Sequence, residues 1–220
     1  MRLYLTRPDA VIFDMDGLLL DSETLALSLH EQAAKSMGIP WEYEIGLKMV
    51  GLNSRDSSSI LTETFGADYP VAELHQKFGE LYEAAIVAGS IPLKPFVHEL
   101  LHLLESRRIP CAVATSTRRV RAEAKLTRAQ LINHFKALAC GDEVTRGKPF
   151  PEIYELAASR IGAQPSRCLA LEDSNAGVRA AVAAGMPAVM VPDLLRPDAD
   201  IRRLGVQVAD SLRDVFAALS

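Results

Sequence analysis

Short, unbroken apolar segments alternate with helix-like segments through the second half of the chain, and this alternation narrows the possible folds. The apolar segments are "CAVATS", "ALACGD", "CLALEDS" and "PAVMVPD", and "DAVIFD" near the N-terminus is a further one. Helical spacing is expected at residues 95–108, 119–135, 151–162 and 175–185. Strands that are apolar on both sides need both faces covered, as in a parallel sheet between helices. We therefore predict an α/β fold.

The segment after the first predicted strand differs, because its periodic stretches are helical only. They are "SETLALSLHEQAAKSMG", "DSSSILTETFG" and "VAELHQKFGELYEAAIVAG". A helical lobe inserted after the first strand explains this change of pattern. We predict a Rossmann-like core made of residues 1–20 and 92–220, with an all-helical cap domain at residues 21–91.

Charge and composition argue against several classes of protein. A net charge of -4 provides no basic surface for nucleic acid or an anionic membrane. Apolar runs such as "AAVAAGMPAVMV", which Gly185 and Pro187 interrupt, are too short to span a membrane, and "MRLYLTRPD" lacks the apolar stretch of a signal peptide. We expect a cytoplasmic protein with no nucleic-acid or membrane partner, in which Cys111, Cys140 and Cys168 are buried reduced thiols. The sequence leaves the oligomeric state open.

Polar side chains stand at the carboxyl ends of the predicted strands, where the loops of an open parallel sheet share one edge. Each of them alone would be typical of a turn or a helix cap. Together they bring carboxylates, hydroxyls and a lysine to one edge: Asp14, Asp16, Thr115, Ser116, Lys148, Glu172 and Asp173. The set as a whole favours a shared site.

Phosphoryl transfer is the chemistry that fits this set. A hard cation such as Mg²⁺ takes oxygen ligands and neutralises carboxylates that would otherwise repel each other at the end of an apolar strand. We expect Asp14, Asp173 and the backbone carbonyl of Asp16 to bind Mg²⁺, with Glu172 as an outer or water-mediated partner.

The same edge supplies the reacting groups. A carboxylate such as Asp14 can act as a covalent nucleophile toward phosphorus. Asp16 lies two residues on, on the same side of an extended segment, and can be the general acid and base. Thr115, Ser116 and Lys148 are candidate donors to the phosphoryl oxygens.

Four motifs, "FDMDG", "VATST", "KPFPEIY" and "LEDSNAG", resemble those of the haloacid dehalogenase-like phosphatases in order and spacing. The resemblance covers nearly the whole chain. It is greatest to the subgroup with a helical cap, which includes β-phosphoglucomutase and sugar-phosphate phosphatases. It implies that Asp14 is the nucleophile and Asp16 the acid/base. It also implies that Thr115 and Lys148 bind the phosphoryl group and that Asp173, supported by Glu172, completes the Mg²⁺ site.

The predicted cap departs from this resemblance in one loop, "MVGLNSRDSS". The mutase-like members carry a lysine before the glycine, where this chain has Val50 before Gly51. This difference weakens the mutase hypothesis. Arg55 remains a candidate contact for the substrate anion.

Two further segments resemble metal-binding motifs, but neither has the surroundings that such a site needs. "HELLH" matches the zinc-protease pattern, but His98, His102 and Glu105 fall on the side of a helix opposite its leucines, as in a solvated face. "DMDGLLLDSETL" begins like a calcium-binding EF-hand loop, yet Leu19 and Leu25 occupy the positions that need Gly and Glu.

The sequence therefore predicts a Mg²⁺-dependent phosphatase that hydrolyses a small phosphomonoester, such as a sugar phosphate, through an aspartyl-phosphate on Asp14. A phosphosugar mutase is the alternative, since it would share the first steps. A non-catalytic phospho-acceptor module resembling a response-regulator receiver is a further hypothesis. The inserted helical lobe favours an enzyme that closes over a small substrate.

Overall fold

The computed structural model describes residues 3–50, 54–89 and 91–220, and of residues 54–56 it describes the backbone alone. The chain divides into two compact units, one made of Met1–Asp21 with Pro92–Ser220 and the other of Ser22–Ile91. We call them the core unit and the helical unit.

The core unit is built on a parallel sheet of six strands in the order β3-β2-β1-β4-β5-β6. The strands are β1 (Ala10–Phe13), β2 (Cys111–Thr115), β3 (Ala137–Cys140), β4 (Cys168–Glu172), β5 (Ala188–Met190) and β6 (Gln207–Val208). This is the strand order of a doubly wound nucleotide-binding fold, in which ligands bind at the carboxyl ends of the strands. The predicted α/β fold with a parallel sheet is confirmed.

Strand β1 lies at the centre of this sheet. Val11 is in register with Cys111 of β2 on one side and with Leu169 of β4 on the other. All four residues of β1 are fully buried. An unbroken apolar sequence is what such a position requires, because both faces of the strand are covered.

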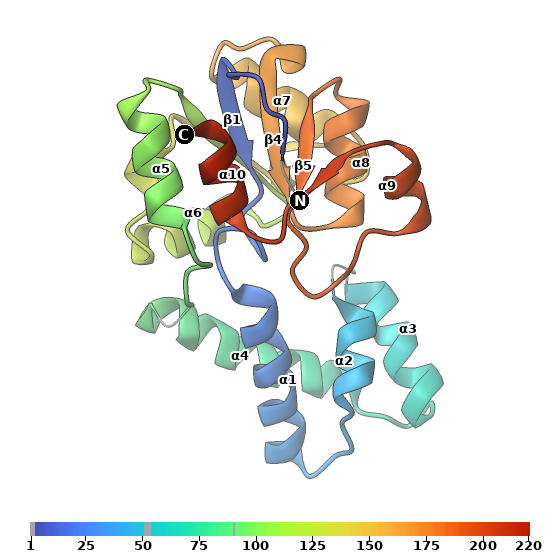
Figure 1. Ribbon diagram of the computed structural model, residues 1–220. Helices are drawn as coiled ribbons and strands as arrows, with labels where there is room; N and C mark the ends of the chain where they lie inside the picture. The colour runs from blue at the N-terminus through green and yellow to red at the C-terminus, as the bar shows by residue number, and fades with distance from the viewer. Residues whose placement is uncertain (1–2, 51–53, 90) are drawn as a thin grey trace. The chain divides into compact units, whose positions relative to one another are not determined.

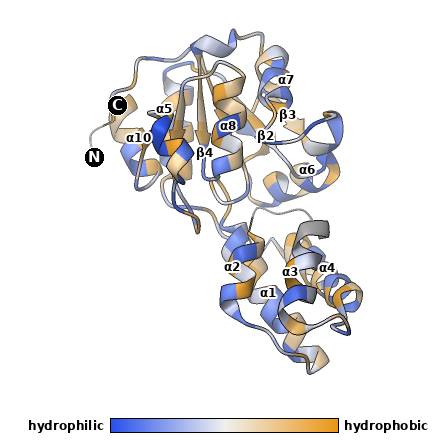
Figure 2. Ribbon diagram, turned by 90° about the vertical axis from the view of Figure 1, so that its right-hand side faces the viewer, coloured by the Kyte–Doolittle hydropathy of each residue, from blue (hydrophilic) through white to orange (hydrophobic). Residues whose placement is uncertain are grey.

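Helices cover both faces of the sheet (Figure 1). On one face, α7 (Glu152–Arg160) and α8 (Asn175–Ala183) pack on the sheet through a cluster rich in alanine, whose small side chains permit close approach. On the other, α5 (Val97–Ser106) and α10 (Leu212–Leu219) lie side by side. Strands β2 and β4 are hydrophobic, whereas the helices around them carry residues of both kinds (Figure 2).

The helices that the sequence predicts are present in the structure, except that one of them ends earlier than expected. The predicted apolar stripe of α5 is buried, but the helix expected at residues 119–135 stops early: α6 spans Arg119–Arg128. Gln130 has a φ of 59°, and this left-handed residue ends the helix. A short 3₁₀ turn, η1 (Ile132–His134), then leads toward β3, and two more 3₁₀ turns are η2 (Gly141–Glu143) and η3 (Pro165–Arg167). Four elements were not predicted: α2 (Tyr43–Met49), α9 (Ala199–Arg203), α10 and β6.

The helical unit contains α1 (Ser22–Met37), α2 (Tyr43–Met49), α3 (Ser54–Phe65) and α4 (Val71–Ala88). Its own apolar cluster includes Ala33, Leu61 and Leu74, all fully buried. Residues far apart in sequence thus form a core within this unit. Across the described residues, no helix is long and apolar enough to cross a membrane.

The two chain segments that lead out of and back into the core unit lie side by side within it. The amide of Asp21 donates to the carbonyl of Pro92 at 2.8 Å, and that of Lys94 donates to Leu19 at 3.0 Å. The Lys94 ammonium also contacts Asp193 at 2.6 Å and Asp21 at 3.4 Å. These bonds fix both segments at the edge where the polar residues gather.

Candidate active site

Lys148 lies at the centre of the polar cluster. Its Nζ donates to Oδ1 of Asp14 at 2.5 Å, to Oε1 of Glu172 at 2.5 Å and to the carbonyl of Ala114 at 3.0 Å. An ammonium group has three hydrogens, so these three acceptors satisfy it completely. The ends of β1, β2 and β4 are thereby joined through one side chain.

Burial and charge shift the titration of these groups in different directions. Burial raises the pKa of Asp14 to about 8, with Lys148 opposing the shift and Glu172 adding to it. Burial also works against ionised Glu172, but Lys148 and Ser174 hold the pKa of that carboxyl below its usual range. The two carboxylates raise the pKa of Lys148 despite its burial. Lys148 is therefore a cation, but its positive charge does not fully offset the effect of burial on the pKa of Asp14.

Glu172 is held by donors on every side. Its Oε2 accepts from the amide and the hydroxyl of Ser174, both at 2.9 Å, and its Oε1 also accepts from the hydroxyl of Tyr154 at 3.1 Å. Ser174 is the N-cap of α8 and accepts from the amide of Gly177. A Cβ at Gly177 would lie 1.6 Å from Oε1 of Glu172, so only glycine leaves room for this carboxylate.

Asp173 completes a cluster of carboxylates. Asp14, Glu172 and Asp173 each offer one oxygen, and these oxygens lie within 4.8 Å of one another. Gly17 packs against the cluster with a φ of 85°, and a Cβ there would lie 2.2 Å from Oδ2 of Asp173. The glycine of the "FDMDG" motif is therefore needed both for its backbone conformation and for this close approach.

The carboxylate of Asp16 has a different environment. Its Oδ1 accepts from Nζ of Lys125 at 2.7 Å and its Oδ2 from the hydroxyl of Thr117 at 2.7 Å. Lys125 lies on α6 and is 5% exposed. Within the described part of the chain, the cluster of possible metal-binding carboxylates includes Asp14 but leaves Asp16 out. Two aspartates separated by one residue are thus held by different cations.

The two predicted hydroxyl residues lie at the end of β2. Thr115 is buried, and its Oγ1 accepts from the amide of Thr117 at 3.1 Å. Ser116 is exposed. A Cβ at Gly141 would lie 2.1 Å from the carbonyl oxygen of Ser116, so the loop after β3 lies directly against this turn.

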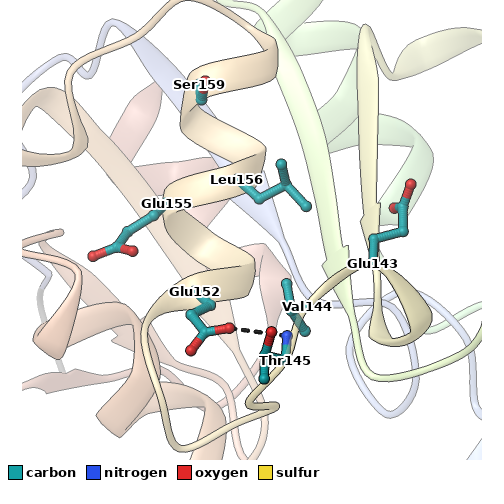
Figure 3. Close-up of a pocket in the computed structure, with 7 residues that line it drawn as sticks. All are labelled: Glu143, Val144, Thr145, Glu152, Glu155, Leu156 and Ser159. Carbon is teal, nitrogen blue, oxygen red and sulfur yellow. Dashed lines mark hydrogen bonds between the residues drawn. The ribbon is translucent and has the colours of Figure 1, made fainter.

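The loop that carries Lys148 is shaped by Glu152 at the start of α7. Oε2 of Glu152 accepts from the amides of Thr145 and Arg146, both at 3.0 Å. Thr145 and Glu152 line an open surface hollow beside α7 (Figure 3), whose described lining does not include Asp14 or Lys148. The hollow therefore lies beside residues that support the loop and is not part of the carboxylate cluster.

The remaining predicted contact, Arg55, lies in the first turn of α3. Its side chain is outside the part of the structure that is described, and so is the preceding loop with Asn53.

Comparison with known proteins identifies the family. A model for haloacid dehalogenase-like hydrolases matches residues 11–191, a span that contains the whole cluster. The chain belongs to the haloacid dehalogenase-like hydrolase family. This confirms the resemblance predicted from the four motifs.

Relatives of this hydrolase include named phosphatases. It is 34% identical over 178 residues to the phosphorylated carbohydrates phosphatase of Thermotoga maritima, covering 81% of this chain and 82% of that one. It is 32% identical over 181 residues to the fructose-1-phosphate phosphatase of Escherichia coli, covering 82% of this chain and 95% of that one. Among solved structures, the chain is similar to a haloacid dehalogenase family hydrolase from Deinococcus radiodurans with bound phosphate and sodium. The TM-score is 0.81 at 28% identity, and the match covers 97% of this chain and 95% of that one.

Sequence reasoning missed three side chains of this cluster, namely Thr117, Lys125 and Tyr154. One signal was available for Lys125: it falls with Ala122 and Leu126 on the buried stripe of α6, where a charged residue needs a partner. Tyr154 stands in the "KPFPEIY" motif, but its contact with Glu172 joins residues far apart in sequence.

Proposed function

We propose that this hydrolase is a Mg²⁺-dependent phosphatase that acts on a small phosphomonoester through an aspartyl-phosphate on Asp14. One observation carries the proposal: Asp14 shares Lys148 with Glu172, whereas Asp16 is bound by Lys125 and Thr117. Paired carboxylates in different environments are typical of a site that divides two roles between them.

The chemistry of the donor set fits a hard cation. Lys148 contacts Asp14 and Glu172, and Asp173 brings a third carboxylate to the same group, an arrangement that a further cation would suit. Oxygen donors are the ligands that Mg²⁺ prefers. Asp14, Asp173 and the carbonyl of Asp16 would hold the ion. When bound, Mg²⁺ supplies positive charge that favours ionised Asp14 and neutralises phosphoryl oxygens.

Asp14 and Lys148 carry the transfer itself. An oxygen of Asp14 attacks phosphorus, and the bond from phosphorus to the ester oxygen breaks. Lys148 is cationic and donates to the phosphoryl oxygens as charge spreads over them, together with Thr115 and Ser116. Since its three hydrogens are already shared among Asp14, Glu172 and Ala114, the ammonium turns one of them from its present acceptor to a phosphoryl oxygen while the other two hold it in position.

Asp16 moves the proton in both steps. It donates a proton to the leaving ester oxygen, and then takes one from the water that attacks the aspartyl-phosphate. The second attack breaks the bond between phosphorus and Asp14 and regenerates its carboxylate. Lys125 and Thr117 orient Asp16 for these transfers.

The proposed substrate class is sugar phosphates. Two relatives with at least 30% identity are a phosphorylated carbohydrates phosphatase and a fructose-1-phosphate phosphatase. We assign residues 21–91 as the cap, which would select the organic part of the substrate, with Arg55 as a candidate contact.

Substitution of Asp14 tests the mechanism. We expect Asp14→Asn to abolish phosphate release from sugar phosphates in the presence of Mg²⁺, because the nucleophile is lost. Asp9→Asn is the matched control, since Asp9 is exposed and contacts Arg167. Near-normal phosphate release by Asp14→Asn would overturn the mechanism.

A substrate screen separates the phosphatase from the mutase and from a non-catalytic phospho-acceptor. We expect phosphate release from one or more sugar phosphates, with no requirement for glucose 1,6-bisphosphate. Isomerised sugar phosphate formed only with that primer would favour the mutase. A stable phosphorylated chain without turnover would favour the phospho-acceptor.

A further inference from the structure

Three of the five histidines of the chain gather on the surface of the core unit, away from the carboxylate cluster. They are His98, His102 and His134, and one ring nitrogen from each lies within 4.8 Å of the other two. His98 and His102 come from α5, whereas His134 comes from η1. The fold therefore adds a third imidazole to a pair that the sequence alone places on a solvated helix face.

The three imidazoles are accessible to solvent. His98 and His102 are exposed and His134 is half-buried, so an ion can reach all three. The ring centroids of His98 and His102 are 6.2 Å apart, and those of His102 and His134 are 5.6 Å apart. Two histidines at positions i and i+4 of a helix present their rings on the same side, one turn apart. Because one nitrogen of each ring already lies within 4.8 Å of the other two, the three imidazoles are close enough to share one ion.

A carboxylate stands beside the third histidine. Oε2 of Glu105 lies 3.9 Å from Nδ1 of His134. A carboxylate near Nδ1 favours the tautomer with a hydrogen on that nitrogen, which leaves the lone pair of Nε2 for a ligand. Glu105 is itself highly exposed, and its side chain can adjust its position.

We propose that His98, His102 and His134 form a binding site for one divalent transition-metal ion of the Zn²⁺, Ni²⁺ and Cu²⁺ class. Imidazole nitrogen suits these ions, whereas Mg²⁺ takes oxygen ligands. The site is separate from the carboxylate cluster and plays no part in the hydrolysis. It is also not a zinc-protease site, because its third ligand comes from η1 and not from an extended helix motif.

A bound ion would join two segments of the core unit. Helix α5 precedes β2, and η1 lies just before β3, the edge strand next to β2. Cross-linking α5 to η1 would stabilise this side of the sheet, because the ion binds the folded arrangement of the three histidines and not the unfolded chain.

The test uses the full chain without a histidine tag, in buffer with excess Mg²⁺ to occupy the carboxylates. Cu²⁺ binding is followed by titration calorimetry, and the EPR spectrum of the Cu²⁺ complex reports nitrogen ligands. The variants are His98→Gln, His102→Gln and His134→Gln, with His75→Gln of α4 as the matched control. Zn²⁺ is then added to each protein in a thermal unfolding experiment.

We expect one Cu²⁺ bound with nitrogen couplings in the wild type and in His75→Gln. Each of the three site variants should bind at least tenfold more weakly, and Zn²⁺ should raise the melting temperature of the wild type more than theirs. If His134→Gln binds as tightly as the wild type, the ion is held by the helix pair alone and the proposed site is wrong. Binding that persists when all three histidines are replaced would equally overturn it.

Discussion

At the scale of single residues, the most informative side chain is Lys125. A lysine this deeply buried loses hydration, and a partner of opposite charge is needed to keep it ionised. Its 2.7 Å contact with Asp16 provides that partner and also fixes the orientation of the carboxylate. Lys125 is therefore a positioning residue for the proposed acid/base and not itself a catalytic residue.

Replacement of Lys125 by methionine tests this role. We expect Lys125→Met to lower kcat by about 10- to 100-fold, less than the loss of a general acid/base itself, with a much smaller change in KM. The pH dependence of kcat should also change, because the environment of Asp16 changes. Exposed Lys136 provides the control variant Lys136→Met. An unchanged kcat and pH profile for Lys125→Met would contradict the assignment.

At the scale of elements, the start of α8 and the end of β4 are built around one carboxylate. Gly177 lies in the first turn of α8, where a side chain would occupy the space of Glu172. The "LEDSNAG" motif therefore combines an acid with the glycine that makes room for it.

Gly177→Ala should therefore destabilise the protein. We expect a loss of about 1–3 kcal/mol in the free energy of unfolding, as for other overpacked sites, together with lower phosphatase activity. Gly79→Ala in α4 is the control: nothing lies within 4 Å of a Cβ there, and alanine should stabilise that helix by about 0.5–1 kcal/mol. Thermal unfolding of both variants measures the difference, and equal melting temperatures would count against the steric argument.

A second element-scale contact joins α6 and α7 through η2. Glu143 accepts two hydrogen bonds from Arg119 and two from Arg160, at 2.8–3.0 Å. The guanidinium of Arg160, followed by that of Arg119, lowers the pKa of Glu143 to about 2. Because the folded-state pKa lies below the unfolded value of about 4.3, the ionised form stabilises the folded state.

The lowered pKa of Glu143 determines how the stability of the protein depends on pH. We expect Glu143→Gln to be less stable than the wild type at neutral pH. The difference should be complete above a pH of about 4.3 and should be lost as the pH falls through about 2, below which Glu143 is protonated in both states. Denaturant unfolding across this range measures it, with Glu44→Gln of α2 as an exposed control. A difference that is independent of pH would indicate lost packing instead of lost charge.

At the scale of the whole molecule, folding brings Asp14, Glu172 and Asp173 together against their mutual repulsion. In the unfolded chain Asp14 is more than a hundred residues away from the adjacent pair Glu172 and Asp173. A cation that binds the cluster therefore favours the folded state by mass action.

We expect Mg²⁺ to raise the melting temperature, by an amount corresponding to about 2.7 kcal/mol when its concentration is 100 times the dissociation constant. EDTA should reverse the effect. Asp173→Asn should remove most of the response, because it takes one carboxylate out of the cluster. A wild-type melting temperature that does not respond to Mg²⁺, at constant ionic strength, would argue against the ion.

Much of the fold could be predicted because its signals are local. The apolar strands, the leucine stripe of α5 and the helical insertion depend on spacing within a few residues. Two features could not be predicted, because the nearby sequence leaves several turns equally favourable. They are the left-handed Gln130 that ends α6 and the short elements after β5. The buried thiols of Cys111, Cys140 and Cys168 followed from their place in apolar segments and are confirmed as free.

The sequence by itself determined which residues reach the carboxyl edge of the sheet, because strand ends and parallel order are encoded in a continuous pattern. Tertiary structure alone decided which of them pair. Lys148 joins Asp14 to Glu172, Lys125 is paired with Asp16, and His134 meets the histidines of α5. These contacts join residues more than 20 positions apart, and only the folded packing brings such groups within the few ångströms over which a hydrogen bond or a metal ion acts.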